Sequence, residues 1–312
     1  MVTIAVSMGD PAGCGPELIA DVCSRGLPRC ARLVVFGDER LLKRCGFKPH
    51  RRVELVQAGK LAGNLRRGRF SLAAARSTLE CLRLAASAVR SGRADALVTG
   101  PIHKRTLSEL GQRGPGQTEW LARFFGAELP VMAFWSPSFS VVLATTHLPL
   151  RRVAAALDRE RLERTVVLAT RELEGRVVPR RPKLALAALN PHGETGGRPG
   201  REEEELLAPA VRRLRSMGID IRGPLPADSV FAAAREGRFD IVVSMYHDQG
   251  LAPLKSLHFY EAVHMTLGLG RVRTSPDHGV AYDIVRRGRR PDPRSMRNAI
   301  RLAAELAGGC RP

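Results

Sequence analysis

Three short apolar runs in this chain each end just before a histidine, and this pattern constrains the fold more than any other feature. The runs are residues 141–146, 184–189 and 240–243, and the histidines that follow are His147, His192 and His247. Short apolar runs bounded by polar residues are typical of buried strands. In an open α/β sheet, ligands bind beyond the carboxyl ends of the strands, so all three imidazoles would share one sheet edge. Three neutral imidazoles suit Zn²⁺ or a similar divalent ion, although each histidine also fits an ordinary polar loop.

Strand-like and helix-like patterns alternate along the rest of the chain. Further strands are predicted over residues 3–8, 33–37, 96–99 and 262–268, and helices over 71–90, 118–125, 159–174, 229–236, 280–287 and 293–307, with another beginning at 202. We expect 271–279 to be a polar loop, and Gly250 to let the chain turn after His247. The alternation predicts an α/β fold.

Two loops after predicted strands are candidates for ligand binding. Residues 9–17 contain three glycines and Pro16 ahead of a predicted helix. This pattern suits either an anion at the helix N-terminus or a plain strand-to-helix turn. Lys104 likewise follows a predicted strand, 96–99. Neither the dinucleotide fingerprint G-x-G-x-x-G nor a Walker phosphate loop is present, so no local motif marks a cofactor site.

Composition excludes several classes of protein. Hydrophobic residues make up 44% of the 312 residues, enough for an ordinary core, and no apolar run approaches the ~18 residues of a membrane span. The first residues lack the basic segment of a signal peptide, so a cytoplasmic location is expected. The formal net charge of +19 comes mainly from arginines spread along the chain, and only 5% of residues are aromatic. Nucleic-acid binding is therefore not expected.

The loops also carry motifs that are highly specific when taken together in order. The chain resembles the 4-hydroxythreonine-4-phosphate dehydrogenases of vitamin B6 biosynthesis along nearly its whole length. The motifs are GDPAG at 9–13 with GPE at 15–17, TGPIHK at 99–104, TE at 118–119, THLPL at 146–150, LNPHGE at 189–194, GP at 223–224 with PAD at 226–228, MYHDQG at 245–250, PLK at 253–255, TLG at 266–268 and RTSPDHG at 273–279.

The resemblance implies a two-domain α/β/α subunit, similar to the isocitrate and isopropylmalate dehydrogenases, which bind NAD(P) without the Rossmann glycines. We expect one domain at residues 1–115 with 280–312, and a second at 116–279 that carries the metal histidines and the dimer contacts. The family also implies a homodimer whose active site lies in an interdomain cleft at the subunit interface.

Roles for individual residues follow from the same resemblance. His147, His192 and His247 would hold one divalent metal ion (Zn, Mg, Co or Mn). The residues expected at the phosphorylated substrate are Gln117, Thr118, Lys255, His264 and Arg273. The candidates for the general base are Lys255 and Lys104, and Asp248 and Asp277 are expected to orient the imidazoles. NAD or NADP would accept the hydride.

Two positions depart from the family pattern. Gln117 stands where the family usually has His, and His264 where it usually has Asn. The implied reaction oxidises 4-phosphooxy-L-threonine to 2-amino-3-oxo-4-phosphooxybutanoate, which loses CO₂ to give 3-amino-2-oxopropyl phosphate in pyridoxal 5'-phosphate biosynthesis. The departures leave open a paralogous dehydrogenase of a phosphorylated sugar acid, such as 4-phospho-threonate or phospho-erythronate, or of a cis-dihydrodiol carboxylate.

Overall fold

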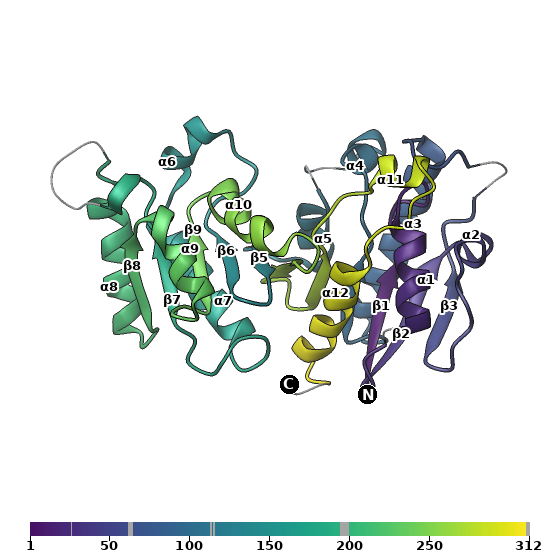
Figure 1. The fold of residues 1–312 in the computed structure, drawn as a ribbon, viewed down its shortest axis with the longest axis horizontal. Coiled ribbons are helices and arrows are strands. Elements are labelled where there is room, and N and C mark those ends of the chain that lie inside the picture. The colour runs from purple at the N-terminus through teal and green to yellow at the C-terminus, as the bar shows by residue number, and fades with distance from the viewer. Residues whose placement is uncertain (26, 62–64, 113, 115, 194–199, 310–312) are drawn as a thin grey trace. The chain divides into compact units, whose positions relative to one another are not determined.

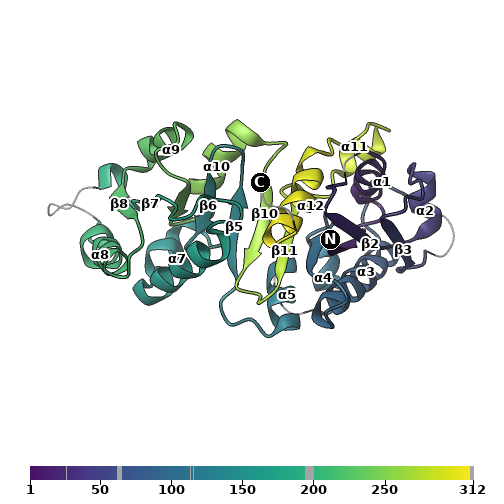
Figure 2. The same ribbon diagram turned by 90° about the horizontal axis from the view of Figure 1, so that it is seen from below.

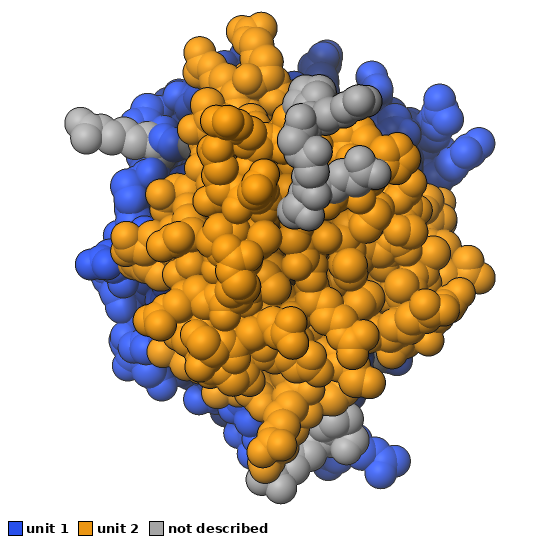
Figure 3. All heavy atoms as spheres, turned by 90° about the vertical axis from the view of Figure 1, so that its left-hand side faces the viewer, with its two compact units in different colours: residues 1–130, 263–312 blue, residues 131–262 orange. Residues whose placement is uncertain are grey.

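The computed structural model describes residues 1–25, 27–61, 65–112, 114, 116–193 and 200–309. The chain divides into two compact units (Figure 3). Unit 1 comprises Met1–Pro130 and Val263–Pro312, and unit 2 comprises Val131–Ala262. Within the described residues, no helix is both long enough and apolar enough to cross a membrane.

Unit 1 is built on a mixed sheet with the strand order β3-β2-β1-β4-β11-β10 (Figure 1). Neighbouring strands are parallel except for β10 and β11, which are antiparallel. The strands are β1 Val2–Ser7, β2 Ala31–Gly37, β3 Val53–Gln57, β4 Ala96–Thr99, β10 Val263–Leu267 and β11 Val272–Pro276. The helices are α1 Gly15–Arg25, α2 Glu39–Arg44, α3 Leu72–Arg90, α4 Arg105–Glu109, α5 Gln117–Phe125, α11 Tyr282–Arg286 and α12 Arg294–Leu306.

Helices cover both faces of this sheet. The longest, α3, begins where Ser71 Oγ accepts a hydrogen bond from Ala74 N (3.2 Å), as its sequence predicts. It packs on β1 and β2, whereas α12 packs on β11 and β4. Figure 2 shows α3 on one side of the strands and α1 with α12 on the other. Strands β1 and β4 are therefore buried on both sides, which is why their sequences are mostly apolar.

The expectation of a polar loop at 271–279 is wrong. Val272–Pro276 form β11, which pairs with β4 in parallel and with β10 in antiparallel register. Its polar residues Arg273, Thr274 and Ser275 are buried. Helix α12 covers this strand, and Thr274 Oγ1 donates to the carbonyl of Ala299 in that helix (2.8 Å). Residues 116–130 and 263–279, expected in the second domain, thus belong to unit 1. Strand pairing over a long sequence separation set this boundary, and no local composition change marks it.

In unit 2 the strand order is β5-β6-β9-β7-β8. Only β5 and β6 are antiparallel; the other neighbours are parallel. Helices α9 and α10 pack on one face and α7 and α8 on the other (Figure 2). The strands are β5 Val131–Trp135, β6 Ser140–Leu143, β7 Leu184–Ala187, β8 Ile221–Leu225 and β9 Ile241–Ser244. The helical segments are η1 Leu150–Arg152, α6 Val153–Ala156, α7 Arg159–Leu173, η2 Pro191–Gly193, η3 Glu203–Leu207, α8 Ala208–Ser216, α9 Ala227–Arg235 and α10 His247–His258.

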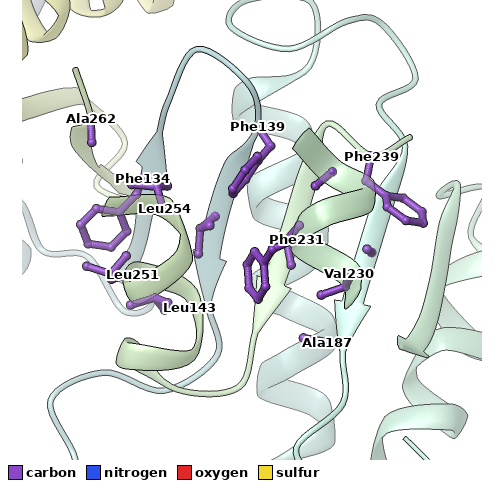
Figure 4. Close-up of a cluster of buried hydrophobic side chains, with 14 of the residues drawn as sticks. Phe134, Phe139, Leu143, Ala187, Val230, Phe231, Phe239, Leu251, Leu254 and Ala262 are labelled. Atoms are coloured by element: carbon purple, nitrogen blue, oxygen red, sulfur yellow. The ribbon is translucent and has the colours of Figure 1, made fainter. Parts of the chain in front are cut away.

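The core of unit 2 lies between its sheet and helices α9 and α10. Phe139 and Phe231 meet with ring centroids 6.0 Å apart, and Leu251 and Leu254 of α10 are buried in the same cluster (Figure 4). Burying side chains of this size contributes roughly 1.5–3 kcal/mol each. This packing fixes α10, and with it His247 at the first residue of that helix.

Gly250 does not form the turn expected from the sequence. It lies inside α10, where an added Cβ would be 2.6 Å from Val141 Cγ1 and 2.7 Å from Ser244 Oγ. Position 250 needs a glycine because the helix approaches β6 and β9 closely. Its backbone conformation is one that any residue can adopt.

We therefore expect Gly250→Ala to lower the free energy of unfolding by about 1–3 kcal/mol, because an added methyl group overpacks the contact with Val141. The matched control is Ala252→Gly at an exposed position of the same helix. It should cost about 1 kcal/mol through helix propensity alone. Denaturant unfolding measures both. A Gly250→Ala protein as stable as the wild type would show that the helix can shift away at little cost.

Candidate active site

The three predicted histidines follow three neighbouring parallel strands of unit 2. Strand β9 lies between β6 and β7 and is parallel to both. His147 follows β6, His247 follows β9 and His192 follows β7. The prediction that the three strand ends share one sheet edge is therefore confirmed. This edge is where open α/β sheets bind their ligands.

Buried polar side chains tie these three strand ends together. Thr145 Oγ1 donates to the carbonyl of Met245 (2.6 Å) and links the end of β6 to the end of β9. Gln249 Oε1 accepts from Met245 N (2.7 Å), and its Nε2 donates to the carbonyl of Ala188 (2.6 Å). One amide side chain thus joins the loop after β9 to the loop after β7. Because these groups are buried, losing either partner would leave an unsatisfied polar atom.

Glu203 organises the turn before His192. Its carboxylate is buried and accepts from Leu189 N and Asn190 N (2.8 Å each) and from Asn190 Nδ2 (2.8 Å). The sequence predicted only a helix beginning at residue 202, so this role of Glu203 was missed. Glu203 lies buried in the π-helical turn Glu203–Leu207. A buried carboxylate requires hydrogen-bond donors, and the turn before His192 supplies them.

His147 and His247 lie side by side, with ring centroids 5.6 Å apart. The Nδ1 atom of His247 is 2.6 Å from Asp248 Oδ1. This contact directs the opposite ring nitrogen, Nε2, away from the carboxylate, as expected for an imidazole oriented toward a metal. His147 is exposed and has a left-handed backbone angle, φ 51°. Such a conformation is costly for a non-glycine residue and is found preferentially at functional sites.

His192 is not brought into the same group. It lies exposed in the turn Pro191–Gly193, also with a left-handed backbone (φ 66°). Across the described part of the chain, no three His, Cys, Asp or Glu side chains are close enough to hold a metal ion. Of the three predicted ligands, His147 and His247 therefore lie side by side, and His192 lies at the adjacent strand end. Glu194, in the same motif, is outside the described residues.

Lys255 completes the predicted residues of unit 2. It is half-buried in α10, with Nζ 6.0 Å from the ring centroid of Phe259. The two residues are close enough for a cation–π contact. Lys255 lies about two turns after His247 in the same helix, α10.

The predicted residues of unit 1 gather around the guanidinium of Arg273. Its Nη1 donates to Thr266 Oγ1 (2.8 Å) and lies 3.1 Å from His264 Nδ1. Its Nη2 donates to Thr99 Oγ1 (2.7 Å) and to Gln117 Oε1 (3.0 Å). Because a guanidinium only donates, His264 Nδ1 must accept, which places the proton of a neutral ring on Nε2. The two residues that depart from the family pattern thus bind the same cation.

Arg273 is a buried charge without a direct counter-ion. It is 3% exposed, and no carboxylate among the described residues forms an ion pair with it. Burial lowers the pKa of the guanidinium to about 9, against the opposing charge of Glu119. A desolvated cation held by neutral acceptors is costly on its own and is stabilised by an incoming anion.

The other expected residues of unit 1 are placed around this centre or at the surface. Thr118 is buried in the first turn of α5, next to Gln117. The backbone N–H of Asp277 donates to Ser295 Oγ (3.0 Å), so this residue joins β11 to α12. Lys104 is exposed just before α4.

Residues 9–17 form a packed turn, which is one of the two alternatives left open by the sequence. Cys14 N donates to the carbonyl of Val280 (2.9 Å), and Gly13 N to that of Asp10 (3.0 Å). The Arg67 guanidinium donates hydrogen bonds to the carbonyl oxygens of Pro11 and Gly13. The backbone N–H groups of Gly13 and Cys14 are therefore already bonded within the protein.

One polar cluster in unit 1 was missed. Tyr282 OH donates to Asp10 Oδ2 (2.5 Å), and the ring of His103 stacks on Tyr282 with centroids 5.3 Å apart. Burial raises the pKa of Asp10 and lowers the pKa of His103. Asp10 and His103 lie in two of the family motifs, but nothing local in the sequence shows that Tyr282 joins them.

Comparison with known proteins assigns the chain to a family. Residues 29–303 match the model of the pyridoxal phosphate biosynthetic protein PdxA. The chain belongs to the PdxA family. A 4-hydroxythreonine-4-phosphate dehydrogenase from Thioalkalivibrio sulfidiphilus (strain HL-EbGR7) is 39% identical over 322 residues, covering 97% of this chain and 96% of the relative.

Solved structures agree with this membership. A 4-hydroxythreonine-4-phosphate dehydrogenase from Klebsiella pneumoniae is 36% identical with a TM-score of 0.83, and 98% of each chain is covered. A terephthalate 1,2-cis-dihydrodiol dehydrogenase from Burkholderia xenovorans LB400 is 27% identical with a TM-score of 0.68, also covering 98% of each chain.

The expected fold class is confirmed as well. A β-decarboxylating dehydrogenase from Thermococcus kodakarensis shares the PdxA-family fold, with a TM-score of 0.52 at 16% identity, covering 98% of this chain and 82% of the other.

Proposed function

We propose that this chain is a 4-hydroxythreonine-4-phosphate dehydrogenase. The secondary alcohol of 4-phosphooxy-L-threonine would lose a proton to a base and a hydride to NAD⁺ or NADP⁺. The resulting β-keto acid would then lose CO₂. The observation that carries this proposal is the buried cation Arg273 in a chain of the PdxA family, because a guanidinium without a counter-ion suits a phosphate ester.

The two units have different tasks in this proposal. In unit 1, Arg273 and Thr118 bind the phosphorylated end of the substrate. In unit 2, Lys255 contacts substrate, and His147 and His247 hold a divalent ion with His192 as the further ligand. When bound, a divalent ion supplies Lewis-acid stabilisation of negative charge on substrate oxygen. Lys255 and Lys104 are the candidates for the base, and the assembly is a homodimer.

A second candidate rests on Gln117 and His264. These side chains make the two longest of the four hydrogen bonds to the Arg273 guanidinium, at 3.0 and 3.1 Å. They are the partners that an anionic substrate would displace most easily. Their identity therefore bears on which substrate is accepted. A phosphorylated sugar acid or a cis-dihydrodiol carboxylate is the alternative, the latter in line with the likeness to the Burkholderia xenovorans enzyme.

A substrate panel separates the two candidates. We expect NAD(P)H formation with 4-phosphooxy-L-threonine to exceed that with 4-phospho-threonate, phospho-erythronate or a cis-dihydrodiol carboxylate by at least roughly 10-fold in kcat/KM. The panel is run with NAD and NADP and with added Zn²⁺, Mg²⁺, Co²⁺ or Mn²⁺. The double variant Gln117→His/His264→Asn serves as the comparison and should keep this order. Faster turnover of another substrate by the wild type would replace the proposal with the second candidate.

A further inference from the structure

A cavity of about 530 Å³ in unit 1 shares no residue with the candidate active site. One wall is a single face of α1, formed by Glu17, Ala20, Asp21 and Ser24. The other walls are the turn after α2, residues 45–50, and the turn before α12 at Arg290 and Pro291. Pockets for small molecules have volumes of about 300–1,000 Å³, so this one is large enough for such a ligand.

The two carboxylates of the cavity are already neutralised. Glu17 forms a bidentate ion pair with Arg67, whose Nη2 is 2.7 Å from Glu17 Oε2. Asp21 Oδ1 accepts from Arg297 at Nε (3.0 Å) and Nη2 (2.5 Å). Neither acid is therefore available to balance other cations in the cavity.

Three cations of the cavity have no such partner. Arg25, Lys48 and Arg290 line it, and in the part of the chain that the structure describes none of them forms a side-chain hydrogen bond or an ion pair. His50 adds a neutral donor, because its Nδ1 accepts from Arg52 N (3.1 Å) and the proton is left on Nε2. The cavity thus carries three uncompensated positive charges beside the apolar surface of Ala20 and the two prolines, Pro49 and Pro291.

We propose that this cavity binds a diphosphate group carried by a small molecule. Three positive charges match the roughly three negative charges of a terminal diphosphate at neutral pH, whereas a single phosphate monoester brings only about 1.5–2. The diphosphate bridge of a dinucleotide carries roughly two negative charges, spread over both phosphates, which the same three cations can also neutralise. Two ligands carry such a group: a free nucleoside diphosphate, and the dinucleotide cofactor of the proposed reaction. The inference rests on the proposed function only for the second of these. The cations are exposed, so the binding weakens as salt is added.

Calorimetry with pyrophosphate, ADP and inorganic phosphate tests the proposal on the full chain. We expect pyrophosphate and ADP to bind the wild type more tightly than phosphate. The variant Arg25→Gln/Lys48→Gln/Arg290→Gln should weaken pyrophosphate binding by about 10-fold or more. The matched control is Arg212→Gln/Arg213→Gln/Arg215→Gln on exposed positions of α8, which removes the same charge and should change affinity less than about 2-fold.

The Michaelis constants for NAD and NADP then identify the source of the diphosphate. An increase in the first variant alone assigns the cavity to the cofactor, and an unchanged value assigns it to a free nucleotide. Equal loss of pyrophosphate binding in both triple variants, or no loss in the first, overturns the proposal. Pyrophosphate binding is measured without turnover, so this result is independent of whether the proposed dehydrogenase activity is correct.

Discussion

Replacing His247 by alanine should lower metal-dependent NAD(P)H formation by roughly 10³-fold or more while leaving the fold intact. His247 is the first residue of α10, its ring lies beside His147, and Asp248 holds its Nδ1 atom. The side chain is half-exposed and makes no contact in the hydrophobic core. Its loss therefore removes the proposed metal ligand without removing packing in the core. Steady-state rates, metal titration by calorimetry and a thermal melt measure the three effects.

His258→Ala is the matched control, because His258 ends the same helix and its Nε2 lies 2.8 Å from the hydroxyl of the exposed Ser138. It should keep activity within about 2-fold, as surface substitutions away from a site usually do. Asp248→Asn should weaken metal affinity by about 10–100-fold, as expected for a partner that orients a ligand. Full activity in a metal-stripped His247→Ala protein would exclude the metal mechanism.

The shared edge of the three histidines was predictable because it depends on a repeated local signal. Each apolar run is a parallel strand, and the carboxyl ends of neighbouring parallel strands meet at one edge. The pattern does not fix the distance between the imidazoles. His147 and His247 are adjacent, whereas His192 is turned by its own left-handed backbone in a separate loop. Loop conformation, which has no periodicity, decides this difference.

The features that could not be predicted depend on partners far along the chain. Strand β11 carries Arg273, whose hydrogen-bond partners Thr266 and Thr99 lie on the neighbouring strands β10 and β4, so no hydrophobic alternation marks it. The Gln249 side chain donates a hydrogen bond to the carbonyl of Ala188, 61 residues earlier in the chain. A glycine just after a strand normally indicates a turn. At position 250, however, glycine is needed because Val141 lies too close for a larger side chain. In each case tertiary contact overrides the local pattern.

We expect Arg273→Met to lower kcat/KM for a phosphorylated substrate by roughly 10³-fold or more, because the phosphate loses its charge-assisted partner. Without ligand, the free energy of unfolding should change by less than about 1.5 kcal/mol. The substitution removes the cost of burying an uncompensated charge together with four hydrogen bonds to neutral groups, and these effects oppose one another. Arg273→Lys keeps the charge but cannot reach all of Thr99, Thr266 and Gln117, so it should recover only part of the activity.

The pH dependence of stability separates the charge from the packing at this position. The folded-state pKa of Arg273 is lowered from 12.5 to about 9, so between these values the unfolded chain binds more protons than the folded one. The destabilising effect of the buried charge is therefore fully present below about pH 9 and is relieved as the pH rises above it. As the pH rises above about 9, the free energy of unfolding of the wild type should increase relative to that of Arg273→Met. Denaturant titrations at several pH values measure this difference. Added phosphate should raise the melting temperature of the wild type more than that of Arg273→Met, which keeps only the cavity beside α1 as an anion site. Equal stabilisation of both proteins by phosphate would show that Arg273 is not the anion site and that its four hydrogen bonds serve the fold alone.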